Sequence, residues 1–296
     1  MTDAVTSTAI RASGVCFCYQ EGTQVLTDID MHAEKGEFIA MLASNGSGKT
    51  TLIKVLVGLL KASKGQVSVN GEDVNAMKSS DLYQRIGLVL QNPNDQLFAP
   101  TVRDDVAFGP RNLGLDEVEI TKRVQEALLA VGAEELIDRA VHQLSFGEQK
   151  RVCLAGVLAM KPSILILDEP TAGLDPAGES KMIHLLSELN RKNDITIIMA
   201  THSVDMLPLF ADRIYVLQKG KVLSEGSPEK IFADHEMVDR ASLRLPYISR
   251  LLHELHHYDG VPLANVPLTI NEARQRIMEI IPADLVIDKL LDTKDD

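Results

Sequence analysis

The sequence contains no tryptophan, and aromatic residues make up only 4% of its 296 residues. It also has no run approaching the roughly 18 consecutive apolar residues that a membrane-spanning helix requires. The N-terminal stretch MTDAVTSTAI does not have the charged and then apolar layout of a secretion signal. These absences predict a protein that stays in the cytosol.

Basic residues and cysteines are also few. The 30 Lys and Arg residues face 42 Asp and Glu residues, which gives a formal net charge of −12. Binding to nucleic acid needs clustered Lys and Arg, so this charge balance disfavours a nucleic-acid partner. The three cysteines, an odd number, fit a reducing compartment. The length allows a large core and two domains.

A phosphate-binding pattern is present in residues 38–60, FIAMLASNGSGKTTLIKVLVGLL. Its first five residues are an apolar run typical of a buried strand, and the apolar spacing after the glycines is that of a helix. Gly46 and Gly48 leave room for successive backbone N–H groups to point at one anion, and the helix N-terminus adds its positive dipole. The stretch therefore predicts a strand, a phosphate loop and a helix.

Two side chains in this loop fit a nucleotide bound with magnesium. Lys49 supplies a charge for the β- and γ-phosphates, and the hydroxyl of Thr50 is placed to coordinate Mg²⁺. The spacing is that of a Walker A loop, except that Ala43 stands where the pattern has its first glycine. At positive φ this alanine would cost about 1–2 kcal/mol, whereas at negative φ it would cost almost nothing.

Two carboxylates follow a later apolar strand, residues 164–167. Asp168 is suited to hold the Mg²⁺ of the nucleotide, and Glu169 could polarise a water against the γ-phosphate. The alternative is a strand that simply emerges into solvent. The lysine of the phosphate loop in the same chain favours the catalytic interpretation.

Two further polar residues follow core strands. Gln91 comes after the strand 86–90 and could reach Mg²⁺ or an attacking water, or it could be a surface amide. His202 follows the strand 195–200, where the end of a strand in an α/β sheet points into the ligand crevice, although a structural histidine is the alternative.

Tyr19 and Ser145 each have two interpretations. An aromatic ring at Tyr19 could stack on a nucleotide base, or it could be a strand tyrosine with a solvated hydroxyl. Ser145 and Glu148 fit an S-x-x-E capping box at the start of a helix, yet the same open N-terminus could bind a γ-phosphate.

Turn-forming residues occur at several other positions in the chain. Asn70-Gly71 and Lys219-Gly220 predict hairpins. Between residues 92 and 160, turn residues are followed by an amphipathic helix that Asp116 opens with Glu119 in a capping box. We expect a helical insertion there, in which partner contacts usually lie. The turn residues are Asn92, Pro93, Asn94, Pro100, Gly109, Pro110 and Gly114.

Together these residues resemble the nucleotide-binding subunit of an ABC (ATP-binding cassette) transporter over residues 9–232. The motifs stand in the order of that family: Tyr19, ASNGSGKTT (43–51), Gln91, LSFGEQ (144–149), ILILDE (164–169), GLD (173–175) and His202. The resemblance implies an α/β fold in residues 1–235, with a P-loop NTPase (RecA-like) core, an antiparallel β subdomain and a helical subdomain at about 92–160.

The resemblance also implies the site. Glu169, His202 and Gln91 would be catalytic, and Thr50, Gln91 and Asp168 would hold the Mg²⁺ that accompanies ATP. ATP would contact Tyr19, Ser44, Asn45, Gly46, Ser47, Gly48, Lys49, Thr50, Thr51, Ser145, Gly147 and Asp175. Each motif occurs once, so the working unit would be a head-to-tail dimer, either a homodimer or a pair with a paralogous ATPase. Ser145 would then reach the γ-phosphate held by the other subunit.

A narrower resemblance is to the ATPases of energy-coupling factor (ECF) importers, especially the cobalt or nickel branch. PNDQLFAPTVRDDVAFGP (93–110), LSFGEQKR, AGVLAMKP and ADRIYVLQKG (211–220) carry it. It implies an ATPase at the cytoplasmic face of the membrane, with a transmembrane coupling protein and a substrate-binding membrane component.

Three alternatives remain open. The chain could serve a vitamin importer of the same type, or it could be a soluble ABC ATPase, although those usually carry paired cassettes or long coiled-coil inserts. It could also be an ATP-binding regulator with impaired hydrolysis, since Ala43 and Glu148 depart from the family pattern. A carboxylate at Glu148 could repel the γ-phosphate or turn back to cap its helix.

Residues 236–296 lie beyond the cassette and predict a small helical extension for self-association or docking. Its first helix has an apolar stripe of Ile248, Leu251, Leu252 and Leu255, and a second helix is expected over 271–281. The string HELHH (253–257) matches the zinc-protease pattern H-E-x-x-H. A helical wheel places His253 and His257 opposite the stripe, on a solvated surface, which argues against a catalytic zinc site.

Overall fold

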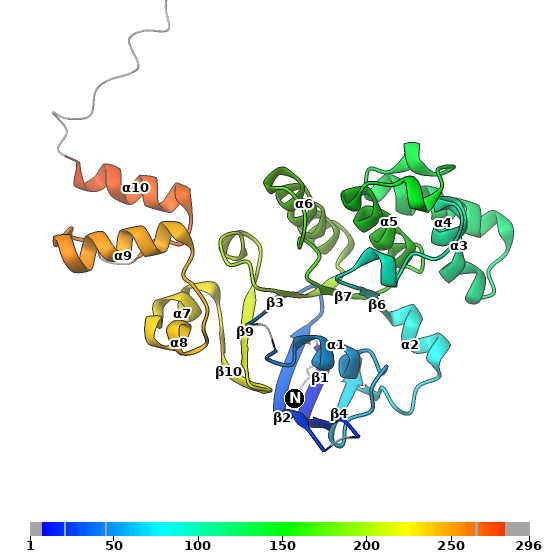
Figure 1. Cartoon of the computed structure of the whole chain (residues 1–296), viewed down its shortest axis with the longest axis horizontal. Coiled ribbons are helices and arrows are strands. Elements are labelled where there is room, and N and C mark those ends of the chain that lie inside the picture. The colour runs from blue at the N-terminus through cyan, green and yellow to red at the C-terminus, as the bar shows by residue number, and fades with distance from the viewer. Residues whose placement is uncertain (1–7, 21, 45, 264–265, 282–296) are drawn as a thin grey trace, which may run out of the picture.

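In the part of the chain that the structure describes, two β-sheets form the framework (Figure 1). The computed structural model describes residues 8–20, 22–44, 46–263 and 266–281. The central sheet has the strand order β10-β9-β3-β8-β7-β6, and the second sheet has the order β2-β1-β4-β5. The central strands are β3 (Phe38–Ala43), β6 (Ile86–Val89), β7 (Ile164–Asp168), β8 (Thr196–Thr201), β9 (Arg213–Gln218) and β10 (Lys221–Gly226). The second sheet is antiparallel and contains β1 (Thr8–Cys18), β2 (Gln24–Glu34), β4 (Lys64–Val69) and β5 (Glu72–Asp73).

Strand β3 lies inside the central sheet and is buried along its whole length. It pairs in parallel with β8 on one side and β9 on the other. Its side chains alternate between two hydrophobic clusters, because successive residues of a strand point to opposite faces. Phe38, Ala40 and Leu42 pack with the helices that follow β6, whereas Ile39, Met41 and Ala43 pack with the antiparallel sheet and the first helix. Both faces of the sheet are therefore covered, as its unbroken apolar strands require.

In the described residues, most helices lie beside these sheets, whereas α9 and α10 lie together away from them, beyond α7 and α8 (Figure 1). Helices α3, α4 and α5 pack on one another within the predicted insertion at 92–160. Within the described ranges, 3₁₀ turns connect elements at Pro93–Asp95, Glu134–Leu136, Val141–Gln143 and Leu207–Leu209. The helices are α1 (Lys49–Leu56), α2 (Ser79–Arg85), α3 (Val102–Asn112), α4 (Glu117–Ala130), α5 (Phe146–Leu158), α6 (Pro176–Asn193), α7 (Pro228–Ala233), α8 (His235–Arg240), α9 (Tyr247–Asp259) and α10 (Ile270–Ile280).

Both predicted hairpins are confirmed. Asn70-Gly71 joins β4 to β5, and Lys219-Gly220 joins β9 to β10. All four residues have positive φ, between 47° and 83°, as a two-residue hairpin turn of this kind requires.

The prediction of a turn at Gly109 and Pro110 is wrong, because both residues lie inside α3. Pro110 is buried near the C-terminal end of this helix. Gly109 lies so close to Met160, just beyond α5, that a Cβ atom would be 2.7 Å from Cγ of that methionine. Packing against the neighbouring helix therefore overrides the local preference for a turn.

The C-terminal helices form a small cluster of their own around Leu252. Of the predicted stripe, Ile248 and Leu255 are half-buried, whereas Leu251 is exposed. None of the helices that the structure describes is both long and apolar enough to cross a bilayer.

Candidate nucleotide site

The loop from β3 to α1 forms one wall of a cavity of about 440 Å³. Ser44, Gly46, Ser47, Gly48 and Thr51 line it together with Lys49 and Thr50. Gly46 and Gly48 have φ of 77° and 100°, the left-handed backbone that glycine adopts without cost. Asn45, the remaining predicted residue of the loop, lies outside the described residues.

Ala43 does not adopt the backbone conformation that would strain an alanine. It is the last residue of β3, pairs with Leu217 of β9 and is fully buried. Its backbone is extended, so the missing first glycine adds no steric cost here.

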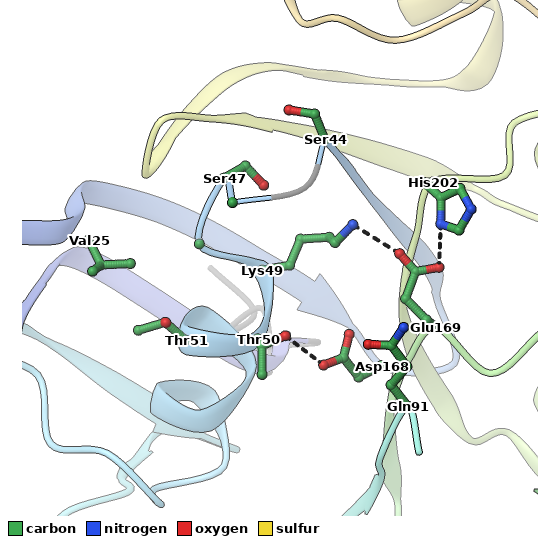
Figure 2. Close-up of a pocket in the computed structure, with 12 residues that line it drawn as sticks. Val25, Ser44, Ser47, Lys49, Thr50, Thr51, Gln91, Asp168, Glu169 and His202 are labelled. Carbon is green, nitrogen blue, oxygen red and sulfur yellow. Dashed lines mark hydrogen bonds and ion pairs between the residues drawn. The ribbon is translucent and has the colours of Figure 1, made fainter. Parts of the chain in front are cut away.

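Lys49 faces the end of β7 (Figure 2). Its Nζ donates to the carbonyl of Ala43 at 2.8 Å and to Oε1 of Glu169 at 2.9 Å. The exposed fractions of the Lys49 and Glu169 side chains are only 9% and 5%. A phosphate entering the cavity would therefore compete with Glu169 for this ammonium group.

Thr50 and Asp168 meet on the other side of the cavity (Figure 2). The Thr50 hydroxyl donates to Oδ2 of Asp168 at 2.8 Å. Burial raises the pKa of Asp168, since it disfavours the charged carboxylate. Oδ1 of Asp168 and Oγ of Ser47 are buried without a hydrogen-bond partner among the residues that the structure describes.

These oxygens fit a magnesium ion bound with a phosphate. Mg²⁺ prefers oxygen ligands, and a buried carboxylate oxygen without a partner is a place for a cation. Gln91 also lines this cavity and presents a side-chain amide to it. The predicted magnesium residues Thr50, Asp168 and Gln91 are thus brought together.

Glu169 is held from two sides and has an unusual backbone. Its Oε2 lies 2.8 Å from Nδ1 of His202, whose side chain is 64% exposed. Its φ is 49°, the left-handed region that costs a non-glycine residue about 1 kcal/mol. Such strain is commonly found at functional sites.

Ser145, Gly147 and Asp175 lie in a second cavity of about 470 Å³, apart from the first. Glu148 turns back and accepts the backbone N–H of Ser145 at 2.7 Å, while the Ser145 hydroxyl accepts the N–H of Glu148 at 3.4 Å. The predicted capping box is therefore confirmed. Asp175 caps α6 by accepting the N–H of Gly178 at 2.7 Å.

Tyr19 does not line the first cavity. Its ring lies edge-on to Phe17 with centroids 4.9 Å apart, and its hydroxyl lies 3.3 Å from Oγ1 of Thr51. The residue is 43% exposed, so it lies at the surface beside α1.

Two residues at the site were not predicted. Val25 lines the first cavity, and no sequence pattern distinguishes it from other strand residues. Lys150 is 3% exposed, and its ammonium donates to the backbone carbonyls of Gln91 and Glu169. A lysine followed closely by the apolar stretch VCLAGVL is the one available signal for its burial.

Two histidines of the HELHH string contact neighbouring histidine rings. His253 is half-buried, with Nε2 3.2 Å from Nδ1 of His235 in α8, so the prediction of a fully solvated surface is wrong for this residue. His257 stacks on His253 at 5.7 Å between centroids. The described part of the chain contains no group of three or more His, Cys, Asp or Glu residues arranged to hold a metal ion.

The chain is similar in sequence to known proteins. The sequence profile described as "ABC transporter" matches residues 26–172. A putative ABC transporter ATP-binding protein of Geobacter sulfurreducens is 50% identical over 90% of this chain and 95% of its own length. The energy-coupling factor transporter ATP-binding protein EcfA of Methanocaldococcus jannaschii is 46% identical over 92% of this chain and 98% of its own.

Among solved structures, cbiO1 of Clostridium perfringens, described as part of the ABC transporter complex cbiONQ, superimposes with a TM-score of 0.73. It is 42% identical and covers 83% of this chain and 99% of its own. The predicted fold class, a P-loop NTPase core with an antiparallel β subdomain and helical additions, is confirmed by this shared fold and by the two sheets described above.

Proposed function

This chain belongs to the ABC transporter family, as an ATPase subunit of an energy-coupling factor importer, and from that premise we propose that two such subunits close head to tail on two ATP molecules. One observation carries the proposal. Each chain presents two separate half-sites, the cavity with Lys49 and Glu169 and the cavity with Ser145 and Asp175. A head-to-tail pair brings the first half-site of one chain against the second half-site of the other.

The phosphates of ATP would lie along residues 44–51, with Lys49 as the cationic contact and the Tyr19 ring against the base. Thr50, Gln91 and Asp168 would hold Mg²⁺, which when bound neutralises charge on the phosphate oxygens. Ser145 and Gly147 of the second subunit would supply hydrogen bonds to the terminal phosphate from the N-terminus of α5. Asp175 would lie at the shared interface.

Glu169 would act as the general base. Its carboxylate is paired with Lys49 and touches His202. When a phosphate attracts Lys49, Glu169 loses that partner and becomes the free acceptor for a proton of the attacking water. His202, on the other oxygen of the same carboxylate, would keep its orientation.

The importer assignment also implies the roles of the two domains and the partners of the chain. Residues 1–235 would form the nucleotide-binding domain, and residues 236–296 would support dimerisation with a second copy or a paralogous ATPase. The subunit would lie at the cytoplasmic face of the membrane and drive a transmembrane coupling protein and a substrate-binding component. Exposed Phe98 and Phe108, in edge-to-face contact at 4.6 Å within the helical insertion, support a protein partner at that surface.

We propose that the cargo is a micronutrient, cobalt or nickel by resemblance, and the similarity to cbiO1 supports this branch. A vitamin importer is the second candidate, because the ATPase does not itself hold the cargo.

We predict that Glu169→Gln abolishes Mg²⁺-dependent hydrolysis and stabilises an ATP-bound dimer, because the amide keeps the shape of the site but accepts no proton. Phosphate release and size-exclusion chromatography with ATP measure the two effects. Glu188→Gln, which alters only an exposed pair with Lys192 on α6, is the matched control and should hydrolyse ATP as the wild type does. A wild-type protein that binds ATP but never releases phosphate, even with its membrane partners, would instead be a regulator.

A further inference from the structure

Lys150 is a buried lysine that contacts two catalytic elements at once. It lies in α5 with 3% of its surface exposed. Its Nζ donates to the backbone carbonyl of Gln91 at 3.1 Å and to that of Glu169 at 3.0 Å. These carbonyls belong to the segments that follow the neighbouring strands β6 and β7. A buried ammonium group needs hydrogen-bond acceptors. Here both acceptors belong to predicted catalytic residues, Gln91 and Glu169.

The contact with Glu169 acts on its strained backbone. The Glu169 carbonyl also accepts the N–H of Ala172 at 3.1 Å, and the Glu169 N–H donates to the carbonyl of Ala200 at 2.9 Å. Three hydrogen bonds therefore hold the residue at a φ of 49°, and the one from Lys150 is charge-assisted. That backbone conformation sets the direction in which the carboxylate leaves the strand.

Lys150 also contacts a residue next to the second half-site. Its Nζ lies 5.4 Å from the ring centroid of Phe146, the residue after Ser145. Phe146 in turn packs against Gly173, where an added Cβ atom would lie 2.8 Å from Cε1 of the ring. Gly173 precedes Asp175 by two residues. Lys150 thus lies between Phe146, next to the surface proposed to face the second subunit, and Glu169, at the proposed site of hydrolysis.

We propose that Lys150 is a positioning residue that ties the backbones of Gln91 and Glu169 to the N-terminus of α5, so that the second subunit's contact with Ser145 is transmitted to the general base. The inference rests on the proposed role of Glu169. A shift of α5 against the sheet would stretch both hydrogen bonds from Lys150 and release the Glu169 peptide from its strained conformation.

The test is Lys150→Met in the full-length chain, assayed with its membrane partners. Methionine keeps an unbranched apolar stem but cannot donate a hydrogen bond. We expect kcat to fall by about 10- to 100-fold, as for a misplaced catalytic group, while KM for ATP stays close to the wild-type value. Lys150→Gln, which keeps N–H donors on a shorter chain, should restore part of kcat. Lys192→Met, at an exposed lysine, is the control and should match the wild type.

A second readout separates positioning from a purely structural role. In the Glu169→Gln background, Lys150→Met should still give the ATP-stabilised dimer, because binding does not use the carboxylate direction. The inference is overturned if Lys150→Met keeps its kcat, or if it loses ATP binding or the dimer in that background. If the methionine variant does not fold, Lys150→Gln is judged by the same criteria. Turnover by Glu169→Gln alone would count against the proposed function, not against the hydrogen bonds of Lys150.

Discussion

At the scale of single residues, Glu169 and Lys49 form an ion pair that is almost fully withdrawn from water. Such a pair contributes little net stability as a whole, because desolvation offsets the attraction between the charges. Removing one partner is different, since it leaves the other charge buried and uncompensated. Part of the stability of the nucleotide-free chain should therefore depend on this contact.

We predict that Lys49→Met lowers the free energy of unfolding without nucleotide by about 3 kcal/mol. Combining it with Glu169→Gln should recover most of that loss, because no charge is then left unpaired. Urea unfolding of the two single variants and the double variant gives the coupling energy directly. Strictly additive effects would mean that the pair does not form in solution.

Ala43 and Glu148 bear on the alternative of impaired hydrolysis. Ala43 is extended within β3, so the absent glycine imposes no strain. The Glu148 carboxylate is engaged with Ser145 of its own chain and lies 3.7 Å from Arg139. Neither departure from the family pattern therefore gives a physical reason for lost turnover.

At the scale of elements, the capping box joins the stability of α5 to its proposed role in binding. The hydroxyl and the backbone N–H of Ser145 hold the pKa of Glu148 below its ordinary value near 4.5. A carboxyl whose pKa is lower in the folded state stabilises the fold above its unfolded pKa. That contribution disappears as the pH falls through the folded pKa.

We predict that Glu148→Gln changes stability little at pH 7, because glutamine also completes a capping box. Below about pH 4.5 the wild type should lose the contribution of its carboxylate, so its free energy of unfolding falls below that of the variant, which does not titrate. Urea unfolding at neutral and acid pH measures this. Parallel pH profiles for the two proteins would show that the carboxylate is not held by Ser145.

Local sequence patterns predicted the elements that depend on neighbouring residues, and they missed the features that depend on contacts between distant parts of the chain. Asn70-Gly71 and the capping box are set by backbone chemistry within a few residues, and both were predicted. The course of α3 through Gly109 and the burial of Lys150 depend on contacts with distant helices and strands, and both were missed. The phosphate loop was predictable because its chemistry restricts residue types at fixed spacing.

At the scale of the whole molecule, each chain carries its two half-sites in separate cavities and exposes Phe98 and Phe108 on the helical insertion. A machine of this kind needs a second ATPase and a membrane partner. We propose that the membrane partner, and not this chain, binds the cargo.

We predict that the tagged chain, isolated from native membranes in mild detergent, comes with an integral membrane coupling protein and a substrate-binding component. Mass spectrometry identifies the components, and uptake of labelled cobalt, nickel or vitamins by reconstituted vesicles identifies the cargo. Recovery of a soluble complex without integral membrane subunits would contradict the importer assignment. Vitamin uptake without metal uptake would select the second candidate.

Strand β3 ends in the phosphate loop and packs alternately into both hydrophobic clusters. Both faces of β3, the strand that supports the loop, are therefore fixed by packing. If heat or denaturant opens either half of the molecule first, one face of β3 is exposed to water and the loop loses its fixed geometry. The chain then loses its ability to bind nucleotide when the less stable half unfolds. This happens well before the remaining secondary structure is lost.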